Sequence, residues 1–385
     1  MSSSQTQNQP LQFQQIGLPA ETEELRAQVR DFLRSEYPTA RRRNSDFTSG
    51  HDPEFSQALG QQGWIGMTWP KAYGGHERTF FERYVVTEEL LAAGAPVSAH
   101  WIADRQSGPL LLRFGSAAQR EKYVPAIARG ESYFSIGMSE PNSGSDLASV
   151  RTTATEVQGG WVINGTKLWS TDAHRNHYMV ALVRTEAPAE NRHAGLSQFV
   201  IDLHKDGVEV RPIRNMTGNE DFNEVVFTDY FVSADDMVGE PGNGWAQVTS
   251  ELGYERSGPE RFLSAFRILV ELVRSLQSQA SAEQHARLGG LVAQLITLRR
   301  MSISVAGMLQ RGDSPNVEAA LVKELGNNYE KLVPEVARLV LPMQHRSPQL
   351  QAALQDTLLL SPSFTLRGGT REILRGVIAR GLGLR

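Results

Sequence analysis

Hydrophobic positions recur with a helical period through the first third of the chain. The spacing of apolar residues at 23–32 predicts an amphipathic helix that should end before Tyr37-Pro38. A second apolar stripe within 80–91 stops at Gly94-Ala95-Pro96. A turn is expected at 69–75. The stretch 113–116, with 122–125 after it, is predicted to be a loop leading to a short helix.

Around Ser132 the hydrophobic period changes from that of a helix to that of a strand. Asn164-Gly165 follows the apolar run 161–163 and predicts a hairpin turn, since both residues tolerate the positive φ of tight turns. Further strands are expected at 178–183, 198–202, 208–212 and 224–231. Short strands at this spacing favour a β-sandwich or barrel over a parallel nucleotide-binding sheet.

The helical period returns after Gly242-Asn243-Gly244 and continues to the C-terminus. The positions that mark one face are Phe262, Phe266, Leu269, Val273 and Leu276, and those that mark the next are Leu288, Leu291, Val292, Leu295 and Leu298. A third helix should open at Ser314-Pro315 and be kinked or broken at Pro334. We therefore predict a multi-domain α+β protein. Its parts are a flexible tail (1–20), an N-terminal helical domain (21–131), a middle β domain (132–243) and a C-terminal helical bundle (244–385).

The composition is that of an ordinary globular protein and excludes several classes of function. The 385 residues include 39 Lys and Arg and 43 Asp and Glu. This near balance of charge gives no reason to expect nucleic acid or an anionic membrane as partner. The absence of cysteine excludes disulfides and thiolate chemistry. His100 and His174 lack metal-ligand spacing, so no metal site is expected. No apolar run is long enough to span a bilayer, and the Ser/Gln-rich beginning is unlike a signal peptide, which predicts a cytoplasmic protein.

Two segments carry the candidate chemistry. Residues 138–146 (Met-Ser-Glu-Pro-Asn-Ser-Gly-Ser-Asp) form a hydroxyl-rich turn after an apolar run, and residues 164–171 (Asn-Gly-Thr-Lys-Leu-Trp-Ser-Thr) lead into a strand. Together they offer small hydroxyls, backbone N–H groups and one flat indole, which a planar cofactor needs. The alternative is that the serines only shape a turn. No Gly-x-Gly-x-x-Gly motif supports a Rossmann dinucleotide site.

These segments resemble the flavin-binding segments of the acyl-CoA dehydrogenase family. The resemblance extends from Trp64 through 114–116 and 239–245 to Gly369-Thr370. It implies a helical domain, a β domain and a C-terminal four-helix bundle, with FAD as cofactor and an acyl-CoA as substrate. It also implies an electron-transfer flavoprotein or a similar acceptor as partner.

The resemblance assigns roles to individual residues. Ser139 would reach the pyrimidine edge of the flavin, helped by backbone groups near Ile136 and Met138. Thr171 would lie on the N5 side and Trp169 beside the ring. The remaining two positions are Ser145, placed where the family contacts CoA, and Thr370, counted with the cofactor-binding residues.

The catalytic base departs from the commonest pattern of the family. Many members carry it as the Glu of a C-terminal Glu-Gly-Thr, where this chain has Gly368, whose N–H could still polarise the thioester carbonyl. A minority place it at the start of the helix after the β domain, before an arginine, where this chain has Glu255-Arg256. We therefore predict Glu255 as the base, with Arg256 orienting it, contacting phosphate or forming a structural ion pair. A first-turn glutamate favoured by the helix dipole is the alternative. Glu251 and Glu260 are competitors.

A second departure concerns the flavin diphosphate. The chain lacks the Arg-x-x-Phe-Gly and Gln-x-x-Gly-Gly stretches that family tetramers usually contribute from a neighbouring subunit. Either a different partner chain supplies the donors, or Arg346 or Arg371 substitutes. Similar losses occur in members that form heteromeric complexes on bulky, often steroid-derived, acyl-CoAs. The open alternatives to a dehydrogenase, homo-oligomeric or with a partner, are a subunit with little or no catalysis and a flavin monooxygenase or nitroalkane oxidase.

Overall fold

A computed structural model describes residues 11–37, 47–48, 50–187, 190–276 and 280–384, leaving aside the side chains of 251–255. The N-terminal third is helical. Its helices are α1 (Thr22–Glu36), α2 (Pro53–Gln61), the short 3-10 helix η2 (Lys71–Tyr73), α3 (Phe80–Ala93), α4 (Ser98–Ile102), the π-helix η3 (Ala103–Ser107), α5 (Gly108–Phe114) and α6 (Ala117–Ala128).

Local signals set most of these helix ends, as predicted. The Thr79 side chain and Glu82 form a capping box at the start of α3, and Gly94 ends that helix in a left-handed conformation. The predicted loop at 113–116 and 122–125 is wrong in extent. Ser116 caps α6 immediately after α5, and Pro125 lies inside α6, so only Gly115 and Ser116 separate the two helices.

The middle of the chain forms one eight-stranded sheet in the order β6-β7-β3-β2-β4-β5-β8, with β1 pairing in parallel with β4. The strands are β1 (Phe134–Gly137), β2 (Thr153–Val157), β3 (Gly160–Thr171), β4 (Tyr178–Arg184), β5 (Leu196–Asp202), β6 (Val208–Ile213), β7 (Phe222–Ser233) and β8 (Met237–Val238). Side chains from β3 and β7 share one core with side chains from β4 and β5. The sheet therefore closes over its own hydrophobic interior.

The hairpin predicted at Asn164-Gly165 is wrong. β3 continues through both residues, and the chain turns instead before Gly160, where β2 and β3 pair from Val157 and Gly160 onward. The Asn-Gly pair is a bulge against β7, with Gly165 at φ 145. A Cβ at Gly165 would lie 2.6 Å from Thr152 Oγ1, so glycine is required by close approach as well as by conformation.

Asn164 stabilises the residue opposite this bulge. Its Oδ1 accepts from the Asp229 N–H at 2.9 Å and its Nδ2 donates to Asp229 Oδ1 at 3.0 Å, while Asp229 has a positive φ of 47. Asn164→Ala should therefore lower the free energy of unfolding by about 1 kcal/mol. Urea unfolding of the variant and the wild type measures this difference. An unchanged midpoint would show that these bonds contribute nothing.

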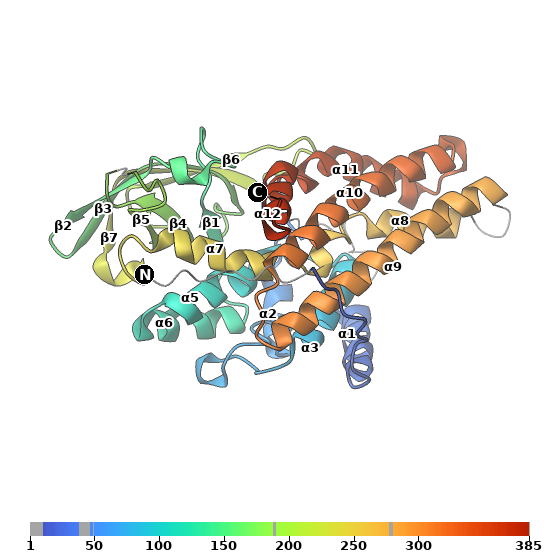
Figure 1. The fold of residues 1–385 in the computed structure, drawn as a ribbon, viewed down its shortest axis with the longest axis horizontal. Helices are drawn as coiled ribbons and strands as arrows, with labels where there is room; N and C mark the ends of the chain where they lie inside the picture. The colour runs from blue at the N-terminus through green and yellow to red at the C-terminus, as the bar shows by residue number, and fades with distance from the viewer. Residues whose placement is uncertain (1–10, 38–46, 49, 188–189, 277–279, 385) are drawn as a thin grey trace.

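The C-terminal part is helical, with bundle helices on the side of the molecule opposite the sheet and α7 extending from the sheet toward them (Figure 1). Its helices are α7 (Gly244–Glu255), the 3-10 helix η6 (Pro259–Arg261), α8 (Phe266–Leu276), α9 (Ala282–Gln310), α10 (Asn316–Val340), α11 (Pro348–Phe364) and α12 (Arg371–Gly381). The predicted order of helices, strands and helices is confirmed. Within the described ranges, no helix combines the length and the apolar character that crossing a bilayer requires.

Two details of the bundle differ from expectation. Pro334 does not break α10, which continues to Val340, because Val333 and Ala337 on either side are fully buried and hold the helix in the core. Val273 is exposed, and Leu272 takes the buried position on α8. One hydrophobic core joins this bundle to the N-terminal helices and to β1.

Candidate functional site

The hydroxyl-rich segment begins where β1 ends. Ile136, Met138 and Ser139 are half-buried. Glu140 and Ser143 then exchange backbone hydrogen bonds of 2.8 and 3.1 Å, which closes a tight turn. Ser145 lies on the exposed outer part of this turn.

The second segment is the C-terminal half of β3, where the strand leaves regular pairing. The register with β7 shifts between Lys167 and Ser170, and Trp169 adopts a left-handed φ of 63. Its indole is 56% exposed and meets Phe222 edge-on with ring centroids 6.2 Å apart. A bulky residue at positive φ is an outlier that needs a reason, and such strain clusters at functional sites.

Hydrogen bonds bring the two segments together. The Leu168 N–H donates to the Ser139 carbonyl at 2.8 Å, and Ser135 Oγ donates to the Thr171 carbonyl at 2.8 Å. The backbone at 136–139 therefore lies alongside the backbone at 168–171. The two segments that the sequence singled out therefore lie side by side.

The arrangement fits a planar ring with polar edges. The exposed indole of Trp169, whose backbone leaves the regular pairing of β3 with β7, is close in the chain or across the strands to the half-buried hydroxyl residues Ser139 and Thr171. At the same bulge Ser170 Oγ and Asn223 Oδ1 are buried and find no hydrogen-bond partner within the described ranges. The strained backbone of Trp169 and these unsatisfied polar atoms both indicate that the bulge has a function and is not a simple irregularity of the strand.

A glycine turn before α12 forms the third part of the candidate site. Gly368 and Gly369 have positive φ values of 64 and 99. Arg256 Nε donates to the Gly368 carbonyl at 3.2 Å, and Lys323 Nζ donates to the Gly369 carbonyl at 3.1 Å. Thr370 follows as the N-cap of α12. The end of α7 and the turn at 368–369 are thus neighbours, although 112 residues separate Arg256 from Gly368.

Glu255 is the last residue of α7, and its side chain lies outside the described residues. The expectation of a first-turn position is wrong, because α7 begins at Gly244. The C-terminal end of a helix carries its negative partial charge, so the dipole does not favour a carboxylate there. Arg256, next in the chain, is buried and caps the helix.

The two competing glutamates are Glu251 and Glu260. The side chain of Glu251 lies outside the described residues. Glu260 is buried, and its Oε2 lies 3.6 Å from Arg105 Nη1. Arg105 stacks on Trp101, with its Cζ 4.1 Å from the ring centroid, and burial lowers the pKa of its guanidinium to about 10. Glu260 therefore belongs to an internal charge pair that no local pattern in the sequence indicated.

The arginines proposed as local substitutes for the diphosphate donors are engaged within the chain. Arg346 donates from Nε to the Leu341 carbonyl, from Nη2 to the Arg338 carbonyl and from Nη1 to Gln351. Arg371 pairs with Glu324, which also pairs with Arg375. Arg346 therefore closes the end of α10, and Arg371 belongs to an ion-pair cluster.

A buried polar layer lies behind Thr171, and the sequence did not indicate it. Asn176 Nδ2 donates to Ser135 Oγ at 3.0 Å, and His51 Nε2 lies 3.3 Å from Asn176 Oδ1. Asp172 accepts from Ser98 Oγ. Burial raises the pKa of Asp172 and lowers that of His51, because neither charged form is well solvated there.

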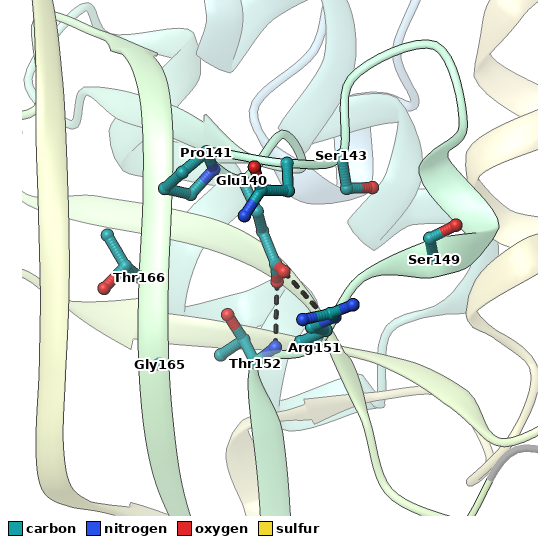
Figure 2. A pocket seen from close by; sticks show the side chains of 9 residues that line it. Glu140, Pro141, Ser143, Ser149, Arg151, Thr152, Gly165 and Thr166 are labelled. Atoms are coloured by element: carbon teal, nitrogen blue, oxygen red, sulfur yellow. Dashed lines mark hydrogen bonds between the residues drawn. The ribbon is translucent and has the colours of Figure 1, made fainter.

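Two hollows lie near the candidate site or elsewhere on the described surface. One of about 330 Å³ is lined by Glu140, Ser143, Ser149, Arg151 and Thr166 among others (Figure 2), and one of about 480 Å³ lies between α1, α3 and α9. Neither is lined by Ser139, Trp169 or Thr171. The indole of Trp169 lines neither hollow and is largely exposed to solvent in the described part of the chain.

Comparison with known proteins identifies the family. The N-terminal domain of acyl-CoA dehydrogenases matches residues 19–131, and their middle domain matches residues 135–230. The acyl-CoA dehydrogenase IpdE1 of Mycobacterium tuberculosis is 34% identical over 384 residues, which covers 94% of this chain and 98% of that protein.

Solved structures agree in fold. A chain of the Tcur3481-Tcur3483 steroid ACAD has a TM-score of 0.86 and 27% identity, covering 96% of this chain and 99% of that one. A chain of the ChsE4-ChsE5 complex from Mycobacterium tuberculosis has a TM-score of 0.82 and 27% identity, covering 97% and 100%. The fold and the matches define a flavin-dependent class of oxidoreductases. The chain belongs to the acyl-CoA dehydrogenase family.

Proposed function

We propose that this chain binds FAD and dehydrogenates an acyl-CoA between its α and β carbons, with Glu255 as the catalytic base. The observation that carries the proposal is the 3.2 Å bond from Arg256 Nε to the Gly368 carbonyl. It ties the residue next to Glu255 to the turn where many family members carry their base. In the proposal the Glu255 carboxylate takes the role of that base.

Each group of this chain has a defined task in the proposal. The bound flavin supplies a hydride acceptor at N5. Ser139 and Thr171 donate to the polar edges of the ring, Trp169 packs beside it, and Thr370 lies near the cofactor. Ser145 contacts CoA.

The acid–base chemistry falls to the C-terminal end of α7 and the glycine turn. Glu255 removes the α-proton through a carboxylate oxygen, and the Gly368 N–H polarises the thioester carbonyl as enolate character develops. Arg256 is a positioning residue in this scheme. Its guanidinium is buried on a carbonyl of the glycine turn, which supports positioning over contact with a phosphate.

We further propose that a second chain completes the cofactor site. The Trp169 indole is 56% exposed, and Arg346 and Arg371 are committed to contacts within the chain. The similar solved structures include a steroid ACAD of two named components and the ChsE4-ChsE5 complex. These features favour a heteromeric partner and a bulky, steroid-like acyl group over a homotetramer acting on a simple fatty acyl-CoA.

The visible spectrum and the mass of the protein expressed alone test the proposal. Oxidised flavin absorption that is bleached by an acyl-CoA without oxygen is the expected result, alone or after adding the partner chain. A protein that binds flavin in neither state is instead a subunit without catalysis of its own. Oxygen consumption without an added electron acceptor would assign it to the oxidases or monooxygenases of the same fold.

A further inference from the structure

Lys167 and Glu140 form an ion pair inside the protein, between the two segments of the candidate site. Lys167 Nζ lies 2.8 Å from Glu140 Oε1, and the two side chains are 0% and 7% exposed. A buried charge pair costs desolvation energy that a hydrophobic pair would not. Its position between these segments therefore calls for a specific role.

The pair joins several backbone segments at one point. Lys167 Nζ also donates to the Met138 carbonyl at 3.3 Å. The Glu140 carboxylate accepts from the Arg151 N–H at 2.6 Å and the Thr152 N–H at 2.9 Å (Figure 2). The end of β1, the approach to β2 and the bulged part of β3 are thus fixed relative to one another.

The surrounding residues leave room for this pair. A Cβ at Gly137 would lie 2.4 Å from Met179 Sδ and 3.3 Å from Lys167 Cγ, so Met179 fills the space of a side chain at 137 and the lysine stem packs closely beside it. Burial lowers the pKa of Lys167 to about 8, although Glu140 opposes this, so the ammonium is charged at neutral pH. Burial alone would raise the pKa of Glu140, but Lys167 and the N–H donors hold it below its usual value.

We propose that Lys167 and Glu140 are positioning residues of the flavin site, which set the spacing of its two segments and strengthen the Ser139 N–H as a donor. The inference rests on the proposed function, in which residues 138–139 and 169–171 hold FAD. The Met138 carbonyl and the Ser139 N–H belong to one peptide unit. An ammonium on that carbonyl polarises the unit and makes the N–H a better donor.

This arrangement has a consequence for the cofactor. A flavin gains negative charge on reduction, so a stronger donor at its polar edge favours the reduced form. The pair should therefore affect the redox potential of the bound flavin as well as the stability of the fold. A purely structural pair would affect only stability.

The test compares the holoprotein with the double variant Glu140→Gln/Lys167→Met. Removing both charges avoids leaving one unpaired in the interior. Glutamine keeps one oxygen, which can accept from one of the two backbone N–H donors that the carboxylate binds. We expect the dissociation constant of FAD to rise at least tenfold. We also expect a tenfold loss of preference for reduced flavin, which lowers a two-electron potential by about 30 mV.

The control is Glu77→Gln/Lys71→Met, the same substitutions in an exposed pair whose charged atoms lie 3.6 Å apart. It should keep the wild-type dissociation constant and potential. A wild type that binds flavin, together with a folded double variant of unchanged potential and affinity, would overturn the inference. A wild type without flavin, alone and with its partner chain, would instead overturn the proposed function.

A measurement on the wild-type holoprotein serves if the double variant does not fold. Burial lowers the pKa of Lys167 to about 8, and Glu140 is the charged group that faces it. Raising the pH from 7 to 9.5 should therefore remove the ammonium and weaken flavin binding several-fold. Flavin affinity that stays constant over this range would also refute the inference.

Discussion

Replacing Glu255 by glutamine should leave FAD bound and slow its reduction by an acyl-CoA by about 10²–10⁴-fold, the usual contribution of a positioned general base. Glutamine has the size of glutamate but cannot take the α-proton. Rapid mixing without oxygen, followed at the absorption of oxidised flavin, measures the rate. The flavin content of the variant, read from the same spectrum, separates lost catalysis from lost cofactor.

Two other glutamates provide matched controls for this experiment. Glu251 lies on the same helix one turn earlier, and Glu240 is exposed in the loop before it. Glu251→Gln and Glu240→Gln should both be reduced at the wild-type rate. If Glu251→Gln is the variant that fails, the base has been assigned to the wrong turn of α7. Bleaching of the Glu255→Gln variant at the wild-type rate would exclude Glu255.

The sequence allowed most of the fold to be predicted, because helix ends and alternating strands depend on residues that are close together in the chain. Thr79 with Glu82, and Gly94 after α3, are signals of this kind. Asn164-Gly165 misled because a dipeptide that tolerates positive φ suits a bulge as well as a hairpin turn. Pro334 misled because the cost of proline inside a helix was outweighed by burial on both sides of it.

The candidate site was only partly predictable. The two flavin-like segments were visible in the sequence, and the Leu168 to Ser139 bond confirms that they meet. The contact between Arg256 and Gly368 spans 112 residues and the pair of Lys167 with Glu140 spans 27, so neither follows from local pattern. Buried charges such as Arg105 look like surface residues until the packing around them is known.

His100 should make the protein sensitive to mild acid. Burial lowers its pKa from the ordinary 6.5 to about 4, with Asp104 opposing the shift and Arg105 and His51 adding to it. Below pH 6.5 the imidazole of His100 therefore binds a proton in the unfolded chain, whereas in the folded chain it stays neutral down to about pH 4. The stability from neutral His100 is complete above pH 6.5 and is lost as the pH falls, by about 2 kcal/mol at pH 5.

Urea unfolding of the wild type and of His100→Asn at pH 7.5 and pH 5 measures this loss, and the difference between the two proteins cancels other titrating groups. The wild type should lose more stability on acidification than the variant does. Ser56→Ala is the control, because it removes the hydroxyl 2.8 Å from His100 Nδ1 but keeps the imidazole. It should lower stability at both pH values and keep the wild-type pH dependence. Equal pH dependence in the wild type and His100→Asn would show that His100 titrates normally in the folded protein, so its burial would not be the source of acid sensitivity.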